Sequence, residues 1–174
     1  MRISFRLSVL GIVAAAAFGV FGLGDHGSAQ AGVNDAPSSG VVRWAGADRF
    51  ATSAEISAAS FAPGVSSVFI ASGLSFPDAL AGAPVAGSSG GPLLLVTGSS
   101  IPAVVAKELD RLNPERIVVL GGSGVIGNAV ATQLGKFTDG RVVRWAGADR
   151  FATSAEISAA SFAPGVSSVF IASG

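Results

Sequence analysis

The chain has 174 residues, of which 49% are hydrophobic, and its 11 Lys and Arg balance its 11 Asp and Glu to a net charge of zero. There is no basic excess of the kind that a nucleic-acid-binding protein carries. The absence of cysteine excludes disulfides and thiolate chemistry, and it is compatible with an exported location.

The first 31 residues have the features of a secretory signal peptide. Arg2 and Arg6 form a positively charged start, residues 9–24 are apolar or glycine, and a small-residue cleavage site ends at Ala31. The apolar run is shorter than the ~20 residues that a membrane-spanning helix needs. We therefore expect cleavage after Ala31 and no stable membrane span in the mature protein. Cleavage also removes His26, the single histidine, which excludes Ser-His-Asp and Cys-His catalysis and zinc sites built on His or Cys.

Residues 32–40 form a polar Gly-, Pro- and Ser-rich linker, and short apolar runs then alternate with helix-like segments. The predicted strands cover residues 41–44, 66–72, 92–96 and 116–120. The predicted helices cover residues 49–61, 77–87, 102–113 and 128–137. Continuous hydrophobicity in the strands indicates a sheet that is covered on both faces. The predicted fold is an open three-layer α/β domain, with a parallel sheet built from βα repeats.

A long segment of the chain occurs twice. Residues 41–73 and residues 142–174 are identical at every position. We interpret residues 41–140 as one complete module and residues 141–174 as the truncated start of a second. The second copy of "SSVFIAS" then lacks the rest of its sheet. We expect it to form an exposed apolar strand with an unpaired edge, prone to swapping and able to compete for the place of the first copy.

A glycine-rich loop follows the most apolar strand. Gly122, Gly124 and Gly127 match the G-x-G-x-x-G pattern, which in dinucleotide-binding folds admits a pyrophosphate at a helix N-terminus. The helix that follows is short for this motif, and no acidic residue ends the next strand, "RVVRW". A tight turn that needs glycine is the structural interpretation. A nucleotide- or cofactor-binding domain using the Gly122–Gly127 loop is the alternative function.

Charged and aromatic side chains lie where two predicted strands lead into helices. Arg43, Trp44, Asp48 and Arg49 belong to the sequence "RWAGADR", and Asp78 follows the next strand. Open α/β sheets bind ligands at this edge, and Trp with Arg suits a sugar face or an anionic group. An Arg–Asp pair that fixes the turn, and a helix cap by Asp78, are the structural alternatives.

Four separated motifs resemble one known family. "RWAGADRFATSAEIS", "VFIASGLSFPDALAGAPVAG", "GGPLLLV" and "RIVVLGGSGVIG" occur in the order and at the spacing of the type 2 cell wall-binding repeat of exported Gram-positive proteins. The resemblance implies a non-catalytic module, without cofactor or metal, that binds an anionic wall polymer and packs beside neighbouring modules. The family's anchoring motif falls on the segment from Pro92 to Leu95. The implied polymer-binding residues are Pro92, Leu93, Leu94, Leu95, Arg43, Arg49, Trp44 and Asp78.

Together these features predict a secreted, wall-associated protein that anchors non-covalently to the Gram-positive cell wall. Removing Arg2, Arg6 and Asp25 with the signal peptide leaves a net charge of −1. Attraction to an anionic polymer must then be local. A second alternative is a fragment of a wall hydrolase or of its activator.

Overall fold

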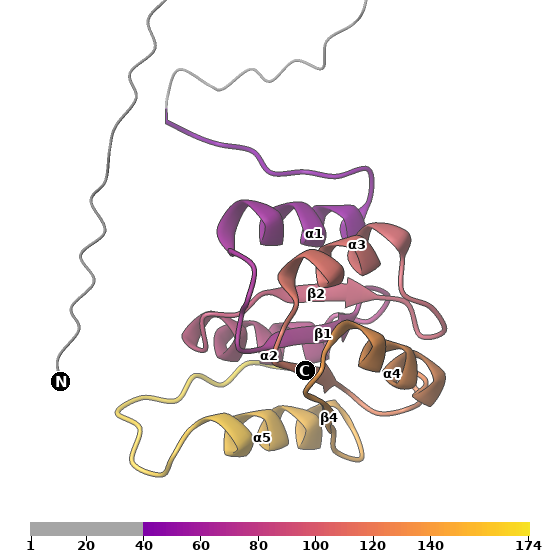
Figure 1. The fold of residues 1–174 in the computed structure, drawn as a ribbon. Helices are drawn as coiled ribbons and strands as arrows, with labels where there is room; N and C mark the ends of the chain where they lie inside the picture. The colour runs from indigo at the N-terminus through magenta and orange to yellow at the C-terminus, as the bar shows by residue number, and fades with distance from the viewer. Residues whose placement is uncertain (1–39) are drawn as a thin grey trace, which may run out of the picture. The chain divides into compact units, whose positions relative to one another are not determined.

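The computed structural model describes residues 40–174, and the predicted signal peptide and all but the last residue of the predicted linker lie outside the described residues. The described part contains a four-stranded sheet in the order β2-β1-β3-β4, in which every neighbouring pair is parallel (Figure 1). The strands are β1 (Val68–Ser72), β2 (Leu93–Val96), β3 (Arg116–Leu120) and β4 (Arg141–Trp145). The predicted α/β fold with a parallel sheet is confirmed.

Helices cover the sheet on both faces. The helices are α1 (Arg49–Ser60), α2 (Pro77–Ser88), α3 (Ala103–Leu112), α4 (Asn128–Leu134), the short 3-10 helix η1 (Gly135–Phe137) and α5 (Arg150–Ser161). Helices α1, α3 and α4 pack on one face, and α2 and α5 pack on the other. No helix within residues 40–174 is long and apolar enough to cross a membrane.

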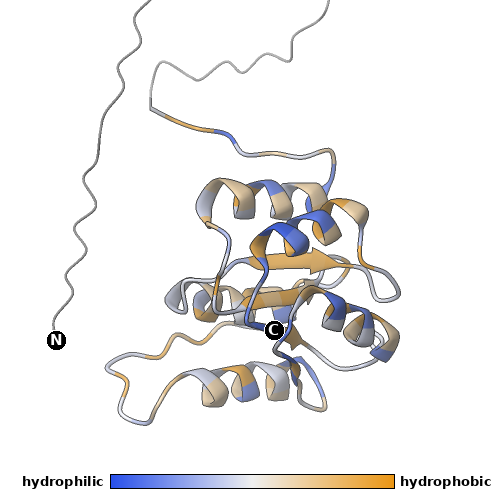
Figure 2. Cartoon of the chain, viewed as in Figure 1, coloured by the Kyte–Doolittle hydropathy of each residue, from blue (hydrophilic) through white to orange (hydrophobic). Residues whose placement is uncertain are grey.

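The alternation of side chains along each strand supplies a core to both faces. In β1, Val68 and Ile70 point to the α1/α3/α4 side, whereas Phe69 and Ala71 point to the α2/α5 side, and all four are fully buried. This is why β1 and β2 are made almost entirely of apolar residues, as their orange colour shows in Figure 2. Helix α2 lies close to the sheet at Gly82, where a Cβ would overlap the Leu120 side chain.

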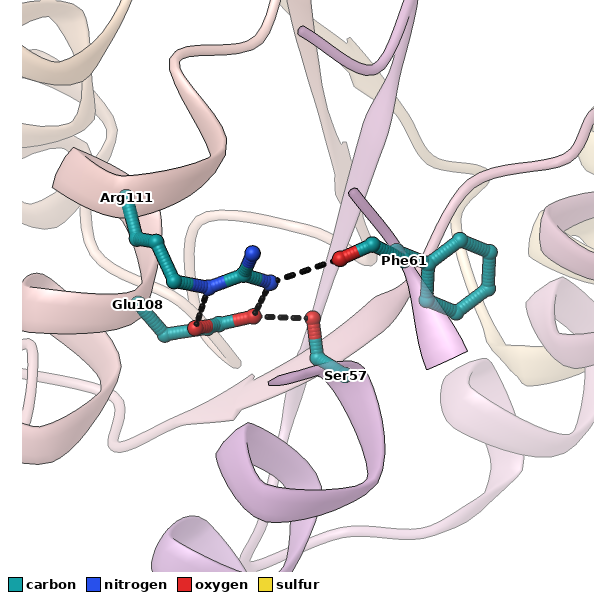
Figure 3. A network of polar contacts seen from close by, with 4 residues as sticks. All are labelled: Ser57, Phe61, Glu108 and Arg111. Atoms are coloured by element: carbon teal, nitrogen blue, oxygen red, sulfur yellow. Dashed lines mark hydrogen bonds and ion pairs between the residues drawn. The ribbon is translucent and has the colours of Figure 1, made fainter. Parts of the chain in front are cut away.

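A buried polar network joins α1 to α3 (Figure 3). Arg111 donates from Nε and Nη2 to the two carboxylate oxygens of Glu108, at 2.7 Å each, and from Nη2 to the Phe61 carbonyl oxygen at 2.9 Å. The Ser57 hydroxyl donates to Glu108 Oε1 at 2.5 Å. Glu108 is only 5% exposed, and the bidentate ion pair with Arg111 balances its negative charge. Hydrogen bonding to Glu108 raises the pKa of Arg111.

The predicted strand at residues 41–44 is wrong for the first copy of the duplicated segment. Residues 41–46 are exposed and form no strand, whereas the identical residues 142–145 belong to β4 and pair with β3. A strand is defined by its hydrogen-bonded neighbour, and only the second copy lies beside an open strand edge. The fourth strand of the sheet therefore comes from the second copy of the segment.

The expected exposed strand near the end of the second copy is only half confirmed. Residues 168–174 are exposed, with Phe170 at 97% and Ile171 at 94% exposure, but they form no strand. The same sequence in the first copy is β1, which lies between β2 and β3. Hydrogen bonds from both sides hold β1 extended, and residues 168–174 have no such neighbours among the described residues.

Candidate binding site at the carboxyl edge of the sheet

The strand order places a topological switch point between β1 and β3. The chain leaves β1 toward β2 on one side and leaves β3 toward β4 on the other, so the connections diverge at the carboxyl ends of these two central strands. Open α/β sheets bind ligands at such a point. Residues 73–76 and residues 121–127 follow β1 and β3 and lie at this point.

A buried carboxyl group lies at the switch point. Asp78 is in the first turn of α2 and is 6% exposed. Gly121, with a φ of +96°, lies against this carboxyl group so closely that a Cβ at Gly121 would overlap it. Burial raises the pKa of Asp78, and the positive charge of Arg150 acts in the opposite direction. Asp78 thus lies at the carboxyl edge of the sheet, and its part in binding a ligand stays a prediction.

Three arginines lie near the switch point. Arg49 donates from Nη1 to the Gly73 carbonyl oxygen at 2.6 Å. Arg144 donates to the carbonyl oxygens of Gly121 at 2.6 Å and Ile126 at 2.9 Å, and its burial lowers its pKa. Its charge is therefore used to order the loop after β3. Arg49 and Arg150 are exposed at the start of α1 and α5, where helix N-termini also favour anions.

The loop between β1 and α2 adds apolar surface to this edge. Leu74 and Phe76 are each 69% exposed. We call the group of Arg49, Leu74, Phe76, Asp78 and Arg150 the carboxyl-edge site. It combines two cations, two exposed apolar side chains and one carboxyl group.

Sequence reasoning missed three members of the carboxyl-edge site. Arg150 is the second-copy equivalent of Arg49, so the repeat itself was the signal that could have found it. No sequence signal marked Leu74 and Phe76 as site residues, because the sequence does not distinguish an exposed apolar residue from a buried one.

The other predicted site residues lie elsewhere. Arg43 and Trp44 are exposed, in the segment before α1 that is outside the sheet. The segment from Pro92 to Leu95 lies in the edge strand β2, and Pro92 stands at its amino end, opposite the carboxyl-edge site.

The side chains of the β2 segment differ in accessibility. Leu94 is fully buried and Pro92 is buried, with its carbonyl oxygen accepting from the Phe69 N–H at 2.9 Å. Leu93 and Leu95 are half-buried on the α2 side of the sheet. Leu93 and Leu95 therefore have the accessible side-chain surface of this motif. Arg49 and Asp78 both lie at the carboxyl edge, where Arg49 contacts Gly73 and Asp78 contacts Gly121. Pro92 and Leu93 lie at the other end of β2.

The glycine loop after β3 is already hydrogen-bonded within the protein. The N–H groups of Val125 and Ile126 donate to the Gly122 carbonyl oxygen at 3.0 and 3.1 Å, and the Gly127 N–H donates to the Gly98 carbonyl oxygen at 2.8 Å. These amides cannot cradle a phosphate without breaking those bonds. The helix after the loop, α4, has only 7 residues. The geometry is that of a tight turn.

A hollow of about 680 Å³ lies between α2, α5 and residues 162–174. Phe151, Ser154 and Ser158 of α5 and the adjacent Phe162 line it, and they repeat residues of the first copy. The first-copy equivalents pack against the sheet and α3. This part of the lining is thus the sheet-packing surface of the repeat.

Within residues 40–174, no group of three His, Cys, Asp or Glu side chains could hold a metal ion. The fold is a three-layer α/β module with its candidate site at the carboxyl edge of a parallel sheet. A family model described as Cell wall binding domain 2 (CWB2) matches residues 43–131, more than half of the chain. The chain belongs to this family, so the resemblance predicted from its motifs is confirmed.

Relatives with curated names or solved structures agree with this assignment. The chain is 27% identical over 120 residues to N-acetylmuramoyl-L-alanine amidase LytC of Bacillus subtilis, covering 69% of this chain and 24% of that protein. It is similar in structure to Cwp6 from Clostridium difficile, with a TM-score of 0.64 and 33% identity over 67% of this chain and 18% of that one. Cwp8 from Clostridium difficile gives a TM-score of 0.60 and 29% identity over 66% of this chain and 20% of that one. The chain spans a quarter or less of each relative's length.

Proposed function

We propose that this protein is a non-catalytic module that anchors a secreted protein to the Gram-positive cell wall by binding an anionic wall polymer. Membership of the cell wall binding domain 2 family, over residues 43–131, is the observation that carries the proposal. We further propose that residues 41–140 act as one module and that residues 141–174 begin a second. The location that follows is the exterior of the cell, on the wall.

The carboxyl-edge site is the surface that we propose for the polymer. Arg49 comes from the first copy of the repeat and Arg150 from the second, and the exposed loop after β1 runs from Gly73, which Arg49 contacts, to Asp78, which Arg150 influences. Guanidinium groups bind phosphate and carboxylate oxygens bidentately. Because the net charge of the mature chain is close to zero, such local pairs must supply the attraction.

Sedimentation with purified cell walls tests both parts of this proposal. We expect the full chain to pellet with walls, and the double variant Arg49→Gln/Arg150→Gln to bind at least about tenfold more weakly through loss of charge-assisted hydrogen bonds. The matched control is Lys107→Gln/Lys136→Gln, which removes the same charge from two exposed positions on other elements. Full-chain protein that stays in the supernatant would sink the anchoring function. An equal loss of wall binding in both double variants would contradict the carboxyl-edge site as the binding surface, but it would leave the anchoring function in place.

The segment from Pro92 to Leu95 offers a separate test, because the family resemblance places the anchoring motif there. The variant Leu93→Ala/Leu95→Ala changes the two half-buried side chains. If this motif contacts the polymer, wall binding falls while the far-UV circular dichroism stays unchanged. Unchanged binding would exclude these two leucines from the contact.

The similarity to LytC favours a second candidate, in which the module serves a wall hydrolase or its activator. On this candidate the chain locates the enzyme and does not itself cleave the wall. We expect the full chain to release no amino groups from purified walls, with or without added zinc. Release that exceeds a buffer blank would contradict the non-catalytic assignment.

A further inference from the structure

The duplicated helix packs through two different faces in its two positions. In α1 the buried residues are Ser53 and Ser57, which are 9% and 1% exposed. In α5, which has the same sequence, the buried residues are Thr153 and Ile157, which are 3% and 1% exposed. One face of the helix therefore packs on the α3 side of a module, and the other face packs on α2.

Each copy leaves exposed the face that the other copy buries. Ile56 of α1, the equivalent of Ile157, is 42% exposed. Ser154 and Ser158 of α5, the equivalents of Ser53 and Ser57, are exposed. Successive helical residues point about 100° apart. The two faces are offset by one residue, so a single helix can make both contacts at once.

The residues before the helix follow the same rule. Val142 to Trp145 pair with β3, and the Trp145 ring packs against Phe69 with their centroids 5.9 Å apart. The identical residues of the first copy are exposed, with Val41 at 63%, Val42 at 67% and Trp44 at 48%. The elements β3 and α2 and the loop after β3, which pack on residues 142–161, lie within residues 68–134.

We propose that residues 41–60 are a docking element for the 68–134 body of a second copy of this chain. The strand-forming residues 41–45 lie parallel beside the second copy's β3, and Ile56 packs on its α2, as residues 142–161 do within one chain. In the intact chain this position is held by the chain's own second copy, so the two identical segments compete for it. The proposal rests on the strand pairing and the helix contact that residues 142–161 make, and it does not depend on polymer binding.

The full chain with Ile157→Asp provides the direct test. A buried aspartate loosens α5 from α2 and opens this position, while residues 41–60 stay intact to fill it from another molecule. We expect the weight-average mass in sedimentation velocity to rise with concentration to about twice that of the monomer or more. The double variant Ile56→Asp/Ile157→Asp opens the same apolar surface but lacks the docking face, so we expect it to stay monomeric.

Two further measurements keep the proposal testable if Ile157→Asp does not fold. Ile157→Ala weakens the same contact with a smaller disturbance, and it is compared with Ile56→Ala/Ile157→Ala. In a Trp145→Phe background, Trp44 is the single tryptophan of the described residues, and its emission should shift to the blue as the Ile157→Ala chain is concentrated. Association that is equal with and without Ile56 overturns the proposal. A folded Ile157 variant that stays monomeric up to the solubility limit also overturns it.

Discussion

Ile56 and Ile157 occupy the same position of the duplicated segment, and 42% of Ile56 but only 1% of Ile157 is accessible to solvent. The helices around them share every residue and the same cap, in which Asp48 and Asp149 accept from the Ala51 and Ala152 N–H groups at 2.7 and 2.8 Å. The difference in burial therefore comes from the neighbouring elements alone. The same substitution can therefore be made in both copies, where the local sequence is identical and only the surrounding elements differ.

The isoleucine pair is the first such comparison. Ile157→Ala should lower the free energy of unfolding by about 2–5 kcal/mol, because it removes buried methyl groups between α5 and α2. Ile56→Ala should change it by about 1 kcal/mol or less, because most surface substitutions are small in effect. Urea unfolding followed by circular dichroism at one dilute protein concentration measures both. Equal losses in the two variants would show that α1 and α5 are not packed as described.

The same asymmetry explains which elements the sequence predicted correctly. β1, β2 and β3 were predicted from uninterrupted apolar runs, because such runs are typical of strands in a sheet that is covered on both faces. The segment from Val41 to Trp44 was predicted as a strand and is not one, although its identical copy is. No rule on local sequence can separate two identical segments, so the decision comes from the strand edge that β3 offers to one of them.

The candidate site was predictable in part for the same reason. Asp78 could be assigned to the sheet edge because it follows the predicted strand at residues 66–72, which contains β1. Arg49 was assigned there from a predicted strand at residues 41–44 that does not form, and it reaches the edge through its hydrogen bond to the Gly73 carbonyl oxygen. Arg150 reaches the same edge only because α5 packs on α2, which is a tertiary contact between repeats. Glu108 was missed as a partner of Ser57 because the two lie in different helices and far apart in the chain.

A serine pair tests the polar network between α1 and α3. Ser57→Ala leaves the buried Glu108 without one of its donors and should cost about 1–3 kcal/mol of unfolding free energy. Ser158→Ala, at the same position of the second copy, is exposed and should stay within about 0.5 kcal/mol of the unmodified chain. Chemical denaturation of both variants makes the comparison. A cost at Ser158 as large as that at Ser57 would contradict the difference in packing.

Asp78 should make stability depend on pH. Burial raises its pKa in the folded state, so folding favours the neutral acid. The contribution of Asp78 to the free energy of unfolding is then fully present below about pH 4 and is lost as the pH rises through the raised pKa. In the variant Asp78→Asn the side chain cannot ionise, so its free energy of unfolding does not fall for this reason. We expect the stability of the unmodified chain to fall relative to Asp78→Asn as the pH increases over this range.

Arg150 supplies the control for that titration. Its positive charge lowers the pKa of Asp78 against the effect of burial, so Arg150→Gln should raise the pKa further and extend the loss of stability to higher pH. Unfolding free energies measured at half-unit pH steps for the three chains give the comparison. A difference between the unmodified chain and Asp78→Asn that does not vary with pH would show that Asp78 is not buried in the folded state.

The two tryptophans report directly on where each copy of the repeat lies. Trp145 is half-buried against Phe69, and Trp44 is 48% exposed in a segment outside the sheet. In dilute solution, the variant Trp44→Phe should therefore emit at shorter wavelength and be quenched less by acrylamide than the variant Trp145→Phe. Both variants keep one tryptophan in the same local sequence, so a difference between them arises from tertiary packing. If both tryptophans were equally protected in dilute solution, the first copy would also have to be packed within its own chain, and the assignment of β4 to the second copy alone would be wrong.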